Sequence, residues 1–218
     1  MTGGERGDVL NPAMNLPEIR ANLTQLRRHE MHRAAEILGV EHRFLGFTDS
    51  GLPADGQNLP GRLLCPRPLT DTTAALVQAM REFRPQVVVA YDENGGYPHP
   101  DHIKTHQTTV AAFAACADEH RYPDAGDPWQ PLKLYYTCAY SKSYFQAIYQ
   151  AMTAAGLDSP HGMVLEQWDD DQPTWEITTQ IHCADYFPIR HRALLAHETQ
   201  IDPNGPALTC PVELEMTA

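Results

Sequence analysis

The sequence lacks the features of a membrane-spanning, disulfide-bonded or nucleic-acid-binding protein. Among its 218 residues, no apolar run approaches the ~20 residues that cross a bilayer. The five cysteines are odd in number and contain no Cys-x-x-Cys pair, so neither a disulfide framework nor a thiolate zinc site is favoured. No Lys/Arg-rich run is present and the formal net charge is −12, so no nucleic-acid partner is expected. A reducing cytoplasm is the expected location.

The length and the pattern of apolar segments predict a single α/β domain over residues 1–218. No Gly-x-Gly-x-x-Gly opens a helix, which disfavours a dinucleotide-binding module. Irregular loop is expected at 53–69. Helices are expected at 16–38, 70–83, 103–119, 143–155 and 185–199, and strands at 42–47, 86–91, 132–140 and 175–183. Their alternation predicts a Rossmann-like, largely parallel sheet flanked by helices, with the first three strands in one sheet and the fourth free to run either way.

One polar stretch, Tyr91–His102, follows the short apolar run 87–90, which is typical of a buried parallel strand. The stretch is broken by glycine and proline and leads into a helix, so it lies beyond the carboxyl end of a strand, where open α/β sheets bind ligands. It contains imidazole and carboxylate groups, which hold divalent metals and transfer protons near neutral pH. The alternative is that its histidines only cap a loop and a helix.

The pattern Tyr-x-His-Pro-Asp-His after a buried strand resembles the second signature of the PIG-L/LmbE-like zinc-dependent deacetylases. The likeness extends through residues 2–12, 45–52 and 196–203 to the branch that acts on mycothiol S-conjugates. It implies a metal-dependent amide hydrolase with a small-molecule thiol-sugar substrate. This enzyme would release glucosaminyl-inositol and an S-conjugated N-acetylcysteine, in detoxification.

The resemblance also implies roles for individual residues. His102 is expected to bind Zn²⁺, with Fe²⁺ as the alternative, and His99 to act as general acid or electrostatic stabiliser. Tyr97 is expected to help hold the oxyanion. Asp101 is expected to orient a histidine without itself binding the metal.

Three further positions match sugar-binding residues of the family. Arg27 matches an arginine that contacts inositol, Asp49 an acidic residue that holds sugar hydroxyls, and Asp8 an acidic residue near the substrate. Arg27 could instead be an exposed helix charge, and Asp49 a turn residue. One cleft at the carboxyl ends of the strands is expected to bring together Tyr97, His99, His102, Asp49 and Asp8.

The first signature of the family, His-Pro-Asp-Asp-Glu, is absent from this sequence. We therefore expect the first strand to be missing, the chain to be cut at both ends, and one metal ligand to be present where the family has three. The chain as given is expected to show little or no amidase activity. Two alternatives stay open: the deacetylase of N-acetylglucosaminyl-inositol, and an inactive fragment that at most binds sugar or partners.

Overall fold

The structure, a computed structural model, describes residues 1–52, 63–138, 141–169, 175–205 and 208–217. Its internal contacts form two compact units: Met1–Gly7 with Phe44–Ala139, and Asp8–Arg43 with Tyr140–Ala218. Within these described ranges, no helix is long and apolar enough to cross a membrane. The single domain expected from the sequence stays a prediction, and each unit is described by itself.

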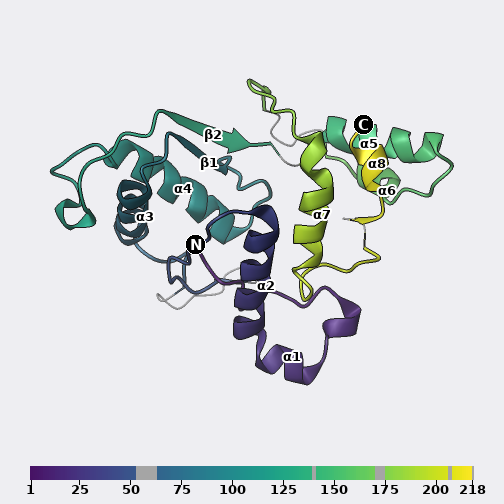
Figure 1. Cartoon of the computed structure of the whole chain (residues 1–218), viewed down its shortest axis with the longest axis horizontal. Coiled ribbons are helices and arrows are strands. Elements are labelled where there is room, and N and C mark those ends of the chain that lie inside the picture. The colour runs from purple at the N-terminus through teal and green to yellow at the C-terminus, as the bar shows by residue number, and fades with distance from the viewer. Residues whose placement is uncertain (53–62, 139–140, 170–174, 206–207, 218) are drawn as a thin grey trace. The chain divides into compact units, whose positions relative to one another are not determined.

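The first unit is built on two parallel strands. Strand β1 (Val87–Tyr91) pairs with β2 (Lys133–Thr137) in a register that runs from Val87↔Lys133 to Tyr91↔Thr137. Helices α3 (Leu69–Phe83) and α4 (Pro100–Ala115) lie on one side of the pair (Figure 1). A parallel sheet flanked by helices confirms the predicted fold class, and α3 confirms the helix expected at 70–83. Helix α4 ends four residues earlier than expected.

The core of this unit lies between the two helices and one face of the sheet. Val77 and Met80 of α3 pack against Ala112 and Ala115 of α4, and Val88 of β1 packs against this cluster. The opposite face of β1 is open: the side chains of residues 87 and 89 are 48% and 61% exposed. The prediction of a strand buried on both faces is therefore wrong, because helices cover only one face in the described residues.

The strand expected at 42–47 is not formed. Phe47 makes an isolated parallel bridge to Thr2, and Thr48 makes another to Leu63. Such single bridges do not make a ladder, and the described residues offer this segment no longer partner. The loop expected at 53–69 falls largely outside the described residues, and its last residue already belongs to α3.

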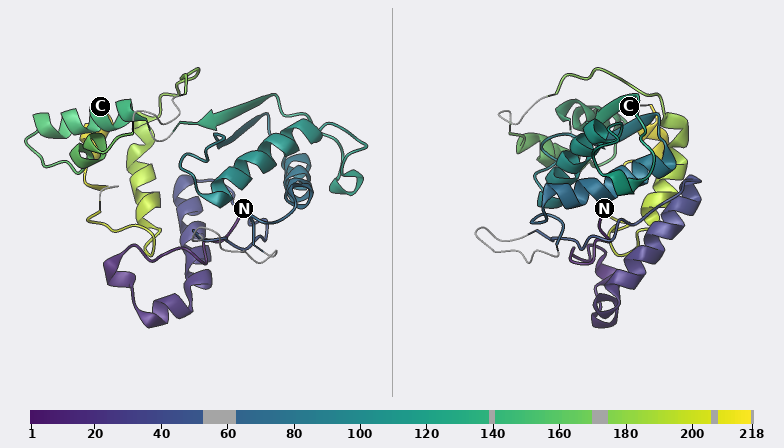
Figure 2. Two further views of the ribbon diagram at one scale, coloured as in Figure 1. Left: turned by 180° about the vertical axis from the view of Figure 1, so that it is seen from behind. Right: turned by 90° about the vertical axis from the view of Figure 1, so that its left-hand side faces the viewer.

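The second unit is helical within its described residues. It contains α1 (Pro17–Ala21), α2 (Leu23–Leu38), α5 (Lys142–Ala154), α6 (His161–Glu166), α7 (Phe187–Leu195) and α8 (Val212–Glu215). Short 3₁₀ turns occur at Pro12–Met14 and Ala184–Tyr186 here, and at Pro123–Ala125 in the first unit. Helices α2 and α7 lie side by side in Figure 1 and in Figure 2, with Ala34, Ala193 and Ala196 buried between them. Such small side chains allow the two backbones to approach closely.

Helix α5 confirms the helix expected at 143–155, but three other predictions for this unit are wrong. The helix expected at 16–38 breaks at Asn22, whose side-chain amide donates to the Glu18 carbonyl at 3.0 Å and so competes with the helical backbone. The helix expected at 185–199 ends at Leu195. The segment 175–183 forms no strand although its apolar residues alternate, because no other strand in the described part of the chain pairs with it.

Arg81 holds the loop that returns the chain from α4 to β2. Its buried guanidinium group donates five hydrogen bonds to five backbone carbonyls, those of Cys116, Asp118, Arg121, Tyr122 and Gly126. Five is the full donor capacity of an arginine side chain. The backbone carbonyls of this loop are thus satisfied by one residue of α3.

Replacing Arg81 with lysine should destabilise the protein strongly, because an ammonium has three donors and cannot reach carbonyls spread around a planar fork. We expect the free energy of unfolding to fall by about 2–5 kcal/mol, measured by urea denaturation. Arg84→Lys is the matched control: Arg84 is half-exposed and lies 3.6 Å from Asp127, so its loss should cost less than about 1 kcal/mol. Equal effects of the two variants would contradict the role of Arg81.

Candidate functional site

The candidate site begins where β1 ends. A tight turn follows the strand, in which the N–H of Gly95 donates to the Asp92 carbonyl at 2.9 Å. The chain then reaches Tyr97 and His99 and enters α4 at Pro100, a residue whose fixed φ and missing N–H suit the first position of a helix. The polar residues that follow β1 therefore lie at the amino end of α4.

His102 lies in the first turn of α4 with its ring fixed on three sides. Its Nδ1 lies 3.0 Å from the carbonyl oxygen of Gly95, so the ring carries its proton on Nδ1 and leaves the lone pair on Nε2. The ring stacks on Tyr91 at 4.3 Å and 6°, and Tyr97 meets it edge-on at 4.8 Å. Burial lowers the pKa of His102 below its ordinary 6.5, and the charge of His99 lowers it further, against the opposing effect of the Gly95 carbonyl. The neutral ring is therefore the form favoured near pH 7.

His99 has the opposite arrangement. It is the N-cap of α4, and its Nδ1 accepts the backbone N–H of Asp101 at 3.1 Å. An accepting Nδ1 places the proton of the neutral ring on Nε2. The ring centroids of His99 and His102 lie 5.1 Å apart. The site thus holds two adjacent imidazoles, one with a bare Nε2 and one with an Nε2–H donor.

Among the described residues, the carboxylate of Asp101 makes no hydrogen bond to a histidine, although its backbone N–H donates to His99. Its Oδ2 accepts the backbone N–H of Ser50 at 2.9 Å, which joins the loop at 49–51 to the start of α4. Its buried Oδ1 has no hydrogen-bond partner in the described part of the chain. Burial, and then the charge of Asp49, raise the pKa of Asp101 above its ordinary 3.8, although hydrogen bonds from Ser50 lower it.

Asp49 is buried beside Asp101 and both of its carboxylate oxygens accept backbone N–H groups. Oδ1 accepts from Gly51 at 2.7 Å and Oδ2 accepts from Arg6 at 3.2 Å. This is the geometry of an Asp-stabilised turn, the alternative that the sequence left open for this residue. The sugar-binding role of Asp49 stays a prediction.

Arg27 and Asp8 belong to the second unit. Arg27 is 4% exposed, so the alternative of an exposed helix charge is wrong. Its Nη2 donates to the backbone carbonyl of Asp8 at 2.7 Å, while the Asp8 residue itself is exposed. The structure brings these two residues together through the backbone of Asp8 and not through its carboxylate. Their role in substrate binding stays a prediction.

His102 is the predicted metal ligand of this site, and its role as a ligand stays a prediction. His102 has the features of a metal-binding histidine, namely a bare Nε2 and an Nδ1–H bonded to a backbone carbonyl. The described residues include no group of three or more His, Cys, Asp or Glu that could hold a metal. The described residues therefore do not by themselves form a site of three or more such ligands.

Sequence reasoning missed the residues that hold His102 in place. Tyr91 was expected as the last residue of a strand and the first of the polar stretch, yet its ring stacks on the imidazole. Gly95 was noted only as a residue that breaks regular structure, yet its carbonyl lies 3.0 Å from His102 Nδ1 and a side chain on it would meet the Cβ of His102. The available signal was the pattern Asp-Glu-Asn-Gly at 92–95, which is typical of a tight turn placed directly before the histidines.

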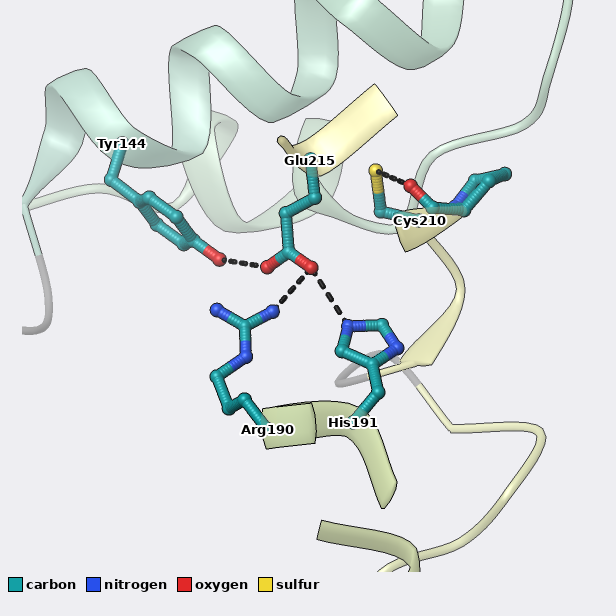
Figure 3. Close-up of polar contacts among 6 residues, drawn as sticks. Tyr144, Arg190, His191, Cys210 and Glu215 are labelled. Carbon is teal, nitrogen blue, oxygen red and sulfur yellow. Dashed lines mark hydrogen bonds and ion pairs between the residues drawn. The ribbon is translucent and has the colours of Figure 1, made fainter. Parts of the chain in front are cut away.

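A second polar cluster lies in the other unit, around Glu215 of α8 (Figure 3). Its carboxylate accepts from Tyr144 at 3.0 Å and from His191 Nε2 at 2.8 Å, and it pairs with Arg190. Burial alone would raise the pKa of Glu215, but the His191 hydrogen bond and the Arg190 charge hold it below its ordinary 4.5. Burial and the charge of Glu215 raise the pKa of Tyr144 to about 12, so its hydroxyl remains a donor. The cluster ties α8 to α5 and α7.

Comparison with known proteins finds one matching family and several similar curated relatives. The PIG-L family, described as GlcNAc-PI de-N-acetylase, matches residues 1–113. A mycothiol S-conjugate amidase of Streptomyces coelicolor is 45% identical over 98% of this chain and 75% of its own length. A 1D-myo-inositol 2-acetamido-2-deoxy-alpha-D-glucopyranoside deacetylase of Frankia alni is 40% identical over 94% of this chain and 74% of its own length. A solved structure of a conserved protein from Thermus thermophilus is 21% identical, with a TM-score of 0.49 over 88% of this chain and 63% of that one.

Replacing Gly95 with alanine should displace His102. A Cβ at this position would lie 2.7 Å from the Cβ of His102, with φ at +74°. Gly96→Ala is a close control, because Gly96 has the same φ but its nearest neighbour would be a ring carbon of Tyr91 at 3.7 Å. We expect Gly96→Ala to cost about 1–2 kcal/mol of unfolding free energy and Gly95→Ala clearly more, measured by urea denaturation. Equal costs would show that the close approach to His102 does not matter.

Replacing Glu215 with glutamine should lower the free energy of unfolding by about 1–3 kcal/mol at neutral pH, because hydrogen bonds to a charged group are lost. The depressed pKa of Glu215 means that its stabilisation is present above its ordinary 4.5 and is lost as the pH falls through the lower folded value. The difference between the parent and Glu215→Gln should therefore shrink below this pH. Urea denaturation as a function of pH measures it, with Glu213→Gln on the exposed side of α8 as the control. A difference that is constant with pH would refute this account.

Proposed function

Because the chain belongs to the PIG-L family of GlcNAc-PI de-N-acetylases, we propose that it hydrolyses the amide bond of mycothiol S-conjugates. Its membership of the family and the names of its relatives make it a hydrolase. The proposed substrate is a small molecule in which an S-conjugated N-acetylcysteinyl group is joined by an amide to glucosaminyl-inositol. The products are glucosaminyl-inositol and an S-conjugated N-acetylcysteine.

The observation that carries this proposal is the pairing of His102 and His99 in opposite tautomers. Amide hydrolysis needs a water to be activated on one side of the carbonyl, and a proton to be given to the leaving amine. The bare Nε2 of His102 suits the first task as a metal ligand, and the Nε2–H of His99 suits the second. Both nitrogens belong to rings whose centroids are 5.1 Å apart, so one amide can reach both.

The remaining roles follow from the same geometry. His102 would hold Zn²⁺, with Fe²⁺ as the alternative, and the bound ion would supply Lewis-acid activation of water. Tyr97 is 47% exposed and meets the rings of both histidines, so its hydroxyl can donate to the developing oxyanion. The carboxylates of Asp101 and Asp49 add negative potential beside the rings. All five cysteines are free in the structure. A cytoplasmic location of the protein remains a prediction.

A second candidate function is the removal of acetyl from N-acetylglucosaminyl-inositol, favoured by the relatives that are named as deacetylases. The two substrates share the glucosaminyl-inositol portion and differ in the acyl group. The greater identity to the amidase and the string Tyr91–Tyr97 favour the amidase.

Three substitutions test the proposal in a version of the protein to which the first signature of the family, His-Pro-Asp-Asp-Glu, has been restored ahead of residue 1. Each is assayed on both substrates with zinc supplied. His102→Ala should lose bound metal and turnover. His99→Ala should keep its metal affinity but lose about 10²–10⁴-fold in kcat, because only a proton donor is removed. Tyr97→Phe should fall less far, since it loses a hydroxyl alone. Metal content, kcat and KM are measured for each variant.

His120→Ala is the control, because His120 is an exposed histidine on the loop after α4 and should leave all three quantities unchanged. Metal binding by His102→Ala equal to that of the parent would refute the ligand assignment. Faster turnover of N-acetylglucosaminyl-inositol than of the S-conjugate would favour the deacetylase. No turnover of either substrate would favour the inactive alternative.

A further inference from the structure

Asp92, a residue that the proposed function does not use, closes the turn after β1. Its Oδ1 accepts the backbone N–H of Asn94 at 2.8 Å and that of Gly96 at 3.2 Å. Its own carbonyl accepts the N–H of Gly95 at 2.9 Å. Asp92 is only 5% exposed, so these bonds are shielded from water. One side chain therefore fixes the backbone on both sides of Gly95.

The group that this turn presents to the site is the carbonyl of Gly95. That carbonyl lies 3.0 Å from His102 Nδ1, and the missing side chain of Gly95 leaves room for the Cβ and backbone of His102, which a Cβ on Gly95 would meet at 2.7 Å and 3.1 Å. A peptide plane held at both ends cannot turn its carbonyl away without breaking the Asp92 bonds. The orientation of the acceptor for His102 is therefore set by Asp92, ten residues earlier in the chain.

The tautomer of His102 depends on this acceptor. A neutral imidazole in water prefers its proton on Nε2, which would block that nitrogen as a ligand. The Gly95 carbonyl requires the opposite, a proton on Nδ1. We propose that Asp92 is a positioning residue, which holds the Gly95 carbonyl in place and thereby keeps Nε2 of His102 unprotonated.

The effect of Asp92 on the tautomer of His102 does not depend on the proposed function. Only the expected effect of Asp92 on catalysis rests on that function. Outer groups that orient a metal-binding histidine typically contribute 10–100-fold to metal affinity or activity. Asp92 acts on His102 indirectly, through the backbone carbonyl of Gly95. It touches neither the substrate nor His102.

The experiment reads the tautomer directly, by ¹⁵N NMR of histidine-labelled, metal-free full-length protein at about pH 8, where an ordinary histidine is neutral. The His102 signals are identified by their absence from His102→Gln. The variants are Asp92→Ala, which removes the acceptor, and Asp92→Asn, which keeps an oxygen at the Oδ1 position. Asp118→Ala is the control for the loss of a similar turn. Asp118 Oδ1 accepts the N–H of His120 at 2.9 Å, beyond the far end of α4, ~24 Å away by helix length.

We expect the parent, Asp92→Asn and Asp118→Ala to carry the His102 proton on Nδ1, and Asp92→Ala to shift it toward Nε2. In the active enzyme, Asp92→Ala should lower kcat about 10–100-fold with little change in KM, and Asp92→Asn should restore most of that loss. Thermal melting checks that each variant is folded.

Two results would overturn the inference: a parent protein with the His102 proton on Nε2, or a folded Asp92→Ala with the parent tautomer. The first measurement needs no variant at Asp92, so the inference can be refuted even if Asp92→Ala fails to fold. Absence of turnover on both mycothiol-type substrates, with the tautomers as expected, would instead refute the proposed function and leave the role of Asp92 standing.

Discussion

The parallel pairing of β1 with β2 is the constraint on which the site depends. Two parallel neighbours cannot be joined by a hairpin, so the chain must leave β1 at its carboxyl end and return to the start of β2. Helix α4 makes most of that return, and it packs on the sheet through the cluster around Val88. The return loop is anchored by Arg81, which holds five of its carbonyls. This topology places the amino end of α4, with its two histidines, at the carboxyl end of β1.

The two histidines owe their different chemistry to the backbone at that junction. His99 faces a donor, the N–H of Asp101 at the open end of a helix, and so its Nδ1 must accept. His102 faces an acceptor, the Gly95 carbonyl of the preceding turn, and so its Nδ1 must donate. Neither assignment requires a charged partner. A strand, a turn and a helix start in immediate succession are enough to make two identical side chains into a donor and an acceptor.

The sequence predicted the features that depend on local residues. The apolar run 87–90, the helix at 70–83 and the helix after Pro100 were each found, because local patterning and helix-start signals decide them. Tyr97, His99, Asp101 and His102 were identified as one group because they are neighbours in sequence. The predictions of strands at 42–47 and 175–183 were wrong. A strand forms only when another strand pairs with it, and an alternation of apolar residues does not supply that partner.

Features that join distant segments could not be read from the sequence. Nothing in residues 49–51 reveals that the Ser50 N–H will meet the Asp101 carboxylate, 51 positions away. This contact engages one carboxylate oxygen of Asp101, whose role in orienting a histidine stays a prediction. Its carboxylate is occupied with a loop, while its backbone N–H is the group that orients His99. His99 is thus held by the peptide group of Asp101, which any residue at this position except proline would provide.

In the second unit too, polar side chains singled out by their type bind the protein's own backbone. Arg27 was singled out as a sugar contact, yet it is buried and its guanidinium reaches the Asp8 carbonyl. One turn further along α2, Glu30 accepts from the backbone N–H and the hydroxyl of Thr199 at 2.6 Å and 2.9 Å. Arg27 Nε also lies 3.5 Å from that hydroxyl. One face of α2 thus ties together Asp8 and the segment after α7. The backbone at Asp8 and that at Thr199 are held by neighbouring turns of one helix, so a shift of α2 moves both.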